Sequence, residues 1–171
     1  MVTAEPTFGD LFGECHRSAL HLETRDDYGT SSPGFVAWRD GVPFDRTNFD
    51  APWVALVSGA VARGVVVRRA RIVSEPVSDY IRYEHSATPY SNLAGGEQVR
   101  WLPRRLASDL ALPGNDFWLF DERLIRFGYF SGNGEPAGHT FCDDPAVIRL
   151  CLAAFGAVWG RGIDHADYRP T

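Results

Sequence analysis

The chain contains no lysine: all 17 of its basic residues are arginine. It therefore lacks the amine that forms Schiff bases and the lysine that contacts phosphates in Walker-type loops. Isoleucine is sparse and there is a single Met. Together with the missing lysine, this composition indicates a high-GC bacterial genome.

Cysteine is also rare, and the three thiols, Cys15, Cys142 and Cys151, show no Cys-x-x-Cys spacing. Cys15 and Cys151 lie among apolar residues with helical spacing, which favours small core residues over catalytic thiols. The first residues lack the basic and apolar regions of a signal peptide, and no apolar run reaches the roughly 18 residues of a membrane span. We therefore expect a cytoplasmic protein without membrane association.

The formal net charge is −5, which argues against direct nucleic-acid binding because phosphates are bound by clustered cations. The local exception is an arginine-rich segment that ends at Arg71. On a strand, Arg69 and Arg71 would share one face and Arg68 would occupy the other. Solvated or salt-bridged side chains are favoured here over direct contact with DNA.

Apolar periodicity and cap residues predict the order of the elements. Thr7 and Asp10 form a capping box at the start of an amphipathic helix that is expected to reach about Leu22. Further helices are expected at 35–39, from Pro52 to about 61, at 79–84 and after Asp144. Strands are expected at 65–73, 99–102, 117–120 and 126–130, followed by a hairpin loop at 132–134 and another strand.

A length of 171 residues is most simply one domain. The predicted fold is an α/β single-domain sandwich with a mixed, partly parallel sheet and helices on both faces. We expect a mainly helical part, residues 7–64, to pack on an α/β part, residues 65–160. The strand–helix–strand unit from Val65 to Leu102 fits a right-handed parallel crossover.

The acid-rich segment from Asp79 to Glu84 is the first candidate site. On a helix, Tyr80 and Glu84 would share a face, and the helix would begin beyond the carboxyl end of a strand, where ligands bind in α/β sheets. An ordinary mixed helix surface is the competing interpretation. The Gly-Gly pair before Glu97 is a weak phosphate-binding signal and favours a turn.

Two aspartates, Asp116 and Asp121, flank an apolar segment at 117–120 and form the second candidate. A structural ion pair with an arginine such as Arg104 is favoured over a paired-carboxylate acid/base site. His139, Cys142 and Asp144 are residue types that bind metals, but no second cluster accompanies them. We expect no metal and no cofactor.

The segment 115–159 resembles the closing half of a phospholipase-D-like domain. Active members carry a His, a Lys two residues later and an Asp five residues beyond the Lys. If Asp121 matches that Asp, Gly114 and Asp116 occupy the other two positions. The resemblance therefore implies the fold without phospholipase D or phosphodiesterase activity.

Nearly the whole chain also resembles a family of single-domain proteins from high-GC Gram-positive bacteria, to which no activity is attached. The resemblance implies a gene beside helix-turn-helix regulators. It is carried by Leu11-Phe12, 21–28, Val73-Ser74-Glu75-Pro76, Asp79-Tyr80-x-Arg82-Tyr83-Glu84, Gly96-Glu97-x-Val99-Arg100 and 116–121.

The leading hypothesis is a non-catalytic cytoplasmic regulatory or interaction module that binds a transcription regulator or a small anionic ligand. The alternative is a small metal-independent enzyme, or a subunit of a heteromeric one, in secondary-metabolite biosynthesis, with carboxylates for acid/base steps and arginines for an anion. The partner would be a regulator or a biosynthetic subunit. Candidate catalytic residues are Glu84, Glu97 and Asp116, and candidate ligand-binding residues are Arg71, Asp79, Tyr80, Arg82, Asn92 and Arg100.

Overall fold

A seven-stranded mixed sheet forms the centre of the computed structural model, which describes residues 5–171. The strand order is β6-β5-β4-β1-β2-β3-β7, with β1, β2 and β3 parallel and the remaining pairs antiparallel. The predicted mixed, partly parallel α/β fold is confirmed. The strands are β1 (Ser18–Glu23), β2 (Val66–Val73), β3 (Gln98–Pro103), β4 (Phe117–Phe120), β5 (Leu124–Phe130), β6 (Pro136–Cys142) and β7 (Ile163–Asp164).

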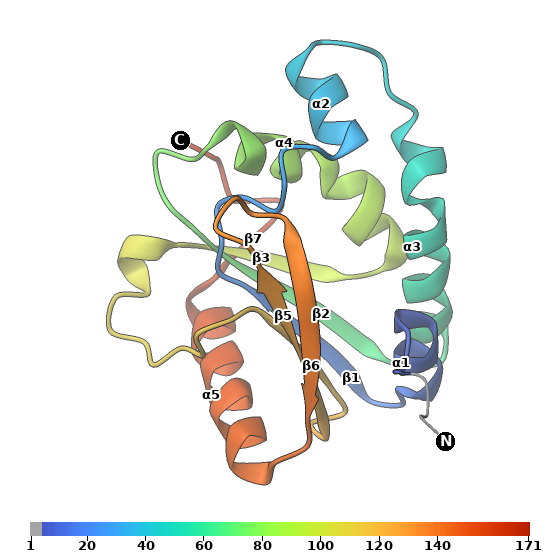
Figure 1. Cartoon of the computed structure of the whole chain (residues 1–171), viewed down its shortest axis with the longest axis vertical. Helices are drawn as coiled ribbons and strands as arrows, with labels where there is room; N and C mark the ends of the chain where they lie inside the picture. The colour runs from blue at the N-terminus through green and yellow to red at the C-terminus, as the bar shows by residue number, and fades with distance from the viewer. Residues whose placement is uncertain (1–4) are drawn as a thin grey trace.

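Helices cover both faces of this sheet: α5 packs on one face, and α1, α3 and α4 lie on the other (Figure 1). No helix within residues 5–171 is long and apolar enough to cross a membrane. The α-helices are α1 (Phe8–Glu14), α2 (Pro33–Arg39), α3 (Arg46–Ala62), α4 (Asp79–Ala87) and α5 (Pro145–Arg161), with a π-helix, η1 (Pro89–Leu93), and a 3-10 helix, η2 (Arg104–Leu106).

The first predicted helix is wrong beyond Glu14, because the chain turns there and forms β1. This strand lies between β2 and β4 at the centre of the sheet, and its Leu20 and Leu22 are buried against α5. The spacing of Cys15, Ala19 and Leu22 mimics a helix face only because Ala19 and Leu22, on opposite sides of this central strand, are both buried. The N-terminal part, residues 7–64, therefore supplies a core strand besides the helices α1, α2 and α3.

The third helix begins earlier than predicted. Asp45 caps it by accepting a hydrogen bond from the Asn48 amide, 3.0 Å away, so α3 starts at Arg46 and Pro52 lies inside it. Side chains cap the next two α-helices as well: Ser78 accepts from Ile81 at the start of α4, and Asp144 accepts from Ala146 at the start of α5. Side chains that accept first-turn amides stabilise these starts.

Alternation along the strands gives the sheet two different faces. On β1, Leu20 and Leu22 join the apolar cluster under α5, whereas His21 and Glu23 point to the opposite face. Register places Arg69 beside His21 and Arg71 beside Glu23 on β2. Charged side chains therefore lie in the interior between the sheet and the helices α3 and α4.

Candidate functional site

A network of buried ion pairs occupies this interior. Glu23 accepts hydrogen bonds from both Arg69 and Arg71. Arg69 Nε also donates to Glu97 Oε2 at 2.8 Å, and Arg71 Nη2 lies 3.2 Å from Glu84 Oε1. Two neighbouring positions on β2 thereby connect carboxylates from β1, from α4 and from the loop before β3.

The charges in this network shift one another's pKa values. Burial alone would raise the pKa of Glu23, but the guanidinium groups of Arg71 and Arg69 hold it well below the ordinary glutamate value. Glu97 follows the same balance, with its pKa lowered by Arg69 against the opposing effect of burial. Glu23 and Glu97 are therefore ionised structural partners of the two arginines.

A cavity of about 340 Å³, here called the Glu84 pocket, adjoins the network. Its charged lining comes from four elements or loops, and its apolar walls come from β4, β5 and α1. Gly128 on β5 leaves space at the wall, since a Cβ there would meet only the Phe130 ring, at 3.6 Å. The lining residues are Phe8, His21, Glu23, Tyr28, Glu84, Asp116, Phe117, Trp118, Arg126, Gly128, Tyr129, Phe130, Pro136 and Gly138.

Glu84 is the carboxylate of this pocket whose hydrogen bonding is incomplete. Its Oε2 is buried and has no hydrogen-bond partner among residues 5–171, while Oε1 contacts Arg71. Burial raises the pKa of Glu84 to about 7, because the nearby Arg71 charge only partly offsets the loss of solvent and the Glu23 charge adds to the rise. A carboxyl group with such a pKa exchanges its proton near neutral pH.

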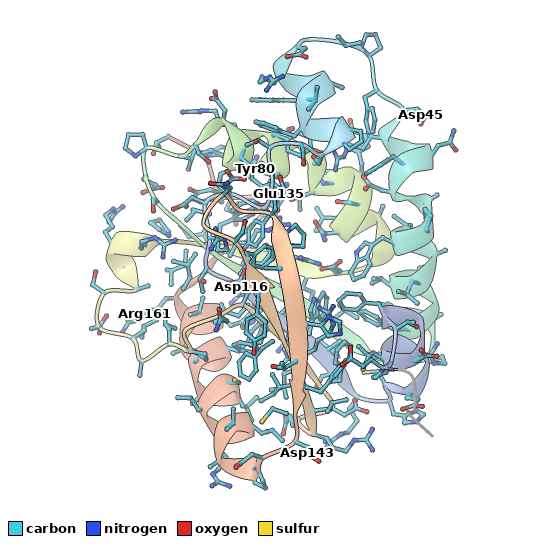
Figure 2. All side chains as sticks on the ribbon, viewed as in Figure 1. Asp45, Tyr80, Asp116, Glu135, Asp143 and Arg161 are labelled. Carbon is cyan, nitrogen blue, oxygen red and sulfur yellow. The ribbon has the colours of Figure 1, made fainter. Side chains whose placement is uncertain are left out.

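Asp116 lies at the wall of the pocket, just before β4 (Figure 2). Its Oδ1 accepts from the Thr24 amide at 2.9 Å and from the Thr24 hydroxyl at 2.6 Å, and its Oδ2 accepts from the Tyr28 hydroxyl. The predicted arginine partner of Asp116 is therefore wrong: in the described chain, neutral donors hold this carboxylate.

Asp121, the other predicted ion-pair residue, has a different role. Its carboxylate accepts backbone hydrogen bonds from His16, Arg17 and Ser18, the shortest being 2.7 Å from the Arg17 amide. Although burial opposes it, this set of donors lowers the pKa of Asp121 to about 2. Asp121 joins the β4–β5 turn to the chain entering β1 and lies outside the Glu84 pocket.

Three of the other predicted residues belong to the network beside the pocket. Glu97 accepts from Arg69, from the Trp53 indole at 2.7 Å and from the Asn92 amide at 2.9 Å. Arg71 donates to Glu23 and to the Thr88 hydroxyl. These contacts leave Glu97 and Arg71 fully engaged, so both serve as supports rather than as free ligand groups.

The remaining predicted residues are not brought together. Asp79 and Arg82 are exposed on α4, and Tyr80 packs behind the pocket against Tyr28 and Phe35. Arg100 lies on the opposite face of the sheet, where its Nε donates to Asp164 at 2.7 Å. Asp79, Arg82 and Arg100 therefore do not lie with the other candidate residues in one site.

Sequence reasoning missed most of the pocket's polar and aromatic residues. The predicted helix to about Leu22 includes His21 and leaves Glu23 and Tyr28 outside any predicted element. The alternation of Leu20 and Leu22 with His21 and Glu23 is the signal that would have placed them on one face of a strand. Trp118 of β4 lies on the same face of the sheet as His21 and stacks on its ring, with centroids 4.3 Å apart.

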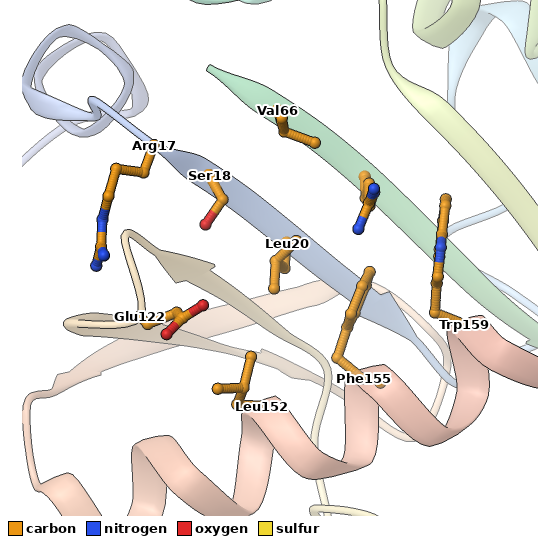
Figure 3. Close-up of a pocket in the computed structure, with 10 residues that line it drawn as sticks. Arg17, Ser18, Leu20, Val66, Glu122, Leu152, Phe155 and Trp159 are labelled. Atoms are coloured by element: carbon orange, nitrogen blue, oxygen red, sulfur yellow. The ribbon is translucent and has the colours of Figure 1, made fainter. Parts of the chain in front are cut away.

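A second hollow, of about 400 Å³, lies on the other face, between α5 and the start of β1 and β2 (Figure 3). Its polar residues are Arg17, Ser18, Arg68 and Glu122 at the edge, and Phe155 and Trp159 of α5 supply apolar surface. Arg68 covers the Trp159 ring at 5.1 Å. This groove contains no buried carboxylate. Across residues 5–171, no group of three His, Cys, Asp or Glu side chains is placed to hold a metal ion.

The chain belongs to the family described as "Domain of unknown function (DUF6879)", which matches residues 6–170. No curated protein matches it. One similar solved structure is "Structure of TrmBL2, an archaeal chromatin protein, shows a novel mode of DNA binding", with a TM-score of 0.49 and 14% identity. The match covers 91% of this chain and 47% of that protein, so this chain spans about half of its length.

This comparison corrects the predicted set of partners. The net charge of the whole chain predicts against direct nucleic-acid binding, whereas the similar structure is that of an archaeal chromatin protein described with a novel mode of DNA binding. At 14% identity the similarity concerns the fold alone, so it assigns no DNA contact to this chain.

Proposed function

We propose that the chain is a non-catalytic regulatory module that binds a small molecule in the Glu84 pocket. The observation that carries the proposal is Glu84 Oε2, which is buried beside the cavity with no donor from the described chain. A buried acceptor without a partner is unfavourable, and a bound molecule would supply the missing donor. The cavity also has the size and the apolar walls with few polar groups that ligand sites have.

The arrangement of the other carboxylates favours recognition over chemistry. Glu23 and Asp116 already accept hydrogen bonds from several donors, which hold them in fixed positions. Fixed polar groups around an apolar cavity give a ligand its orientation. The regulatory role, the neighbouring regulator genes and the phospholipase-D-like second half remain predictions, and a helix-turn-helix gene beside this one would support the first.

A small metal-independent enzyme is the second candidate. The observation that favours it is the pKa of Glu84, raised by burial to about 7, which suits a general acid or base at neutral pH. The two functions differ in one measurable outcome: a binding module returns its ligand unchanged, whereas an enzyme converts it over time. Mass spectrometry of each recovered ligand after prolonged incubation separates them.

The test is a small-molecule screen by thermal shift on three proteins: the native chain, Gly128→Leu and Gly156→Leu. Gly128→Leu fills the Glu84 pocket, and Gly156→Leu fills the groove under α5; a Cβ at Gly156 meets nothing within 4 Å. We expect compounds that stabilise the native chain to lose their effect on Gly128→Leu and to keep it on Gly156→Leu. The reverse pattern would overturn the proposal.

A further inference from the structure

We propose that the ligand of the Glu84 pocket is a small organic cation, whose protonated amine donates to Glu84 while its apolar body lies against the aromatic walls. This inference rests on the proposed function and adds the chemical class of the ligand. It stands on three features of the site: its balance of charge, the engagement of its arginines and the character of its walls.

The balance of charge around the pocket is negative. Four buried or nearly buried carboxylates, Glu23, Glu84, Glu97 and Asp116, surround two buried guanidinium groups. Arg126 on the β5 wall reduces the formal excess from two negative charges to one, counting Glu84 as ionised and His21, 3.1 Å from Glu23, as neutral. An uncompensated charge in a poorly solvated interior favours a ligand of opposite sign.

The arginines are not available to an anion. Arg71 contacts Glu23, Glu84 and the Thr88 hydroxyl, and Arg69 is shared between Glu23 and Glu97. An anionic ligand would have to displace these carboxylates and would then lie beside them. The Glu84 Oε2 atom, in contrast, needs a donor, and an ammonium group offers three.

The walls suit an apolar body attached to the amine. Trp118 and Phe130 line the cavity, and the Phe130 ring lies edge-to-face with Tyr28 at a centroid distance of 5.1 Å. Aromatic rings attract cations as well as apolar groups. A volume of about 340 Å³ corresponds to roughly ten water-sized groups at ~30 Å³ each, which is the size of a simple arylalkylamine.

The test uses three probes with the same phenyl group and similar size, 2-phenylethylamine, 2-phenylethanol and phenylacetate, titrated calorimetrically into the native chain. We expect the amine to bind at least about tenfold more tightly than the alcohol or the carboxylate. Glu84→Gln should remove that preference, because the amide is neutral and nearly isosteric. Asp143→Asn, an exposed change at the other end of β6, should leave the preference intact.

Gly128→Leu provides a second variant that leaves every charge in place, and it should abolish binding of the amine. If the alcohol or the carboxylate binds as tightly as the amine and Gly128→Leu removes that binding, the cation inference is overturned while the proposed function stands. The cation inference is also overturned if none of the three probes binds while Gly128→Leu still removes the binding of screened compounds. If screened compounds bind Gly128→Leu as well as they bind the native chain, the proposed function itself fails.

Discussion

Glu84 and Arg71 make a single contact, in which Arg71 Nη2 lies 3.2 Å from Glu84 Oε1. The second oxygen of Glu84 has no donor within residues 5–171 and borders the pocket. Arg71 also binds Glu23, so its one positive charge is divided between two carboxylates. This shared arginine connects the structural ion network to the proposed binding site.

Replacing Arg71 with methionine should destabilise the fold strongly. The change leaves Glu23 and Glu84 without their common partner in the interior, and breaking one side of a buried ion pair typically costs about 3–5 kcal/mol. Urea denaturation followed by circular dichroism measures the loss. Arg82→Met on the exposed face of α4 is the matched control and should change stability by under about 0.5 kcal/mol. Equal effects of the two changes would contradict the network's role.

Glu84→Gln should change how stability depends on pH. The pKa of Glu84 rises from its ordinary value of 4.5 to about 7 on folding, so the folded state binds more protons than the unfolded state between these values. Stability of the native chain should therefore fall as pH rises through this window, by up to about 3 kcal/mol from this group. The glutamine variant should lose that slope, as measured by urea unfolding at a series of pH values. An unchanged slope would show that Glu84 titrates normally.

Asp121→Ala should weaken the junction between β1 and the β4–β5 turn. The substitution removes the acceptor for the backbone amides of His16, Arg17 and Ser18. Hydrogen bonds to charged groups contribute about 1.5–3 kcal/mol each, and the three share one carboxylate, so a loss of roughly 2–4 kcal/mol is expected. Amide hydrogen exchange should accelerate most at residues 16–18. Uniform acceleration over the whole sheet would argue for a global effect instead.

Local signals in the sequence sufficed for much of the fold. The β-branched run of β2, the Asp144-Pro145 start of α5 and the turn at 132–134 predict their elements because each depends on neighbouring residues. The local signals of β1 conflict. Its Ala19 and Leu22 continue a helical spacing from α1, while Leu20 and Leu22 alternate with His21 and Glu23; pairing with β2 and β4, which are distant in sequence, decides for a strand.

The site was predictable only in part, for the same reason. Glu84 and Asp116 were singled out from local motifs, and both line the pocket. The partners that set their properties come from β1 and from the loop at Thr24 and Tyr28, whose positions depend on the central strand. Arg100 and Arg71 are both predicted as ligand-binding residues, but the register of β3 pairs Arg100 with Ala70 and places it on the opposite face from Arg71.

The most direct test of the account is the pKa of the Glu84 carboxyl group. The NMR chemical shift of its carboxyl carbon is followed against pH in the free protein and at saturating 2-phenylethylamine. Comparison with Glu84→Gln assigns the signal. We predict a pKa near 7 in the free protein, since burial raises it to about 7, and a fall of at least about one unit when the amine is bound. A pKa that stays the same at saturation would contradict the claim that Glu84 recognises the ligand.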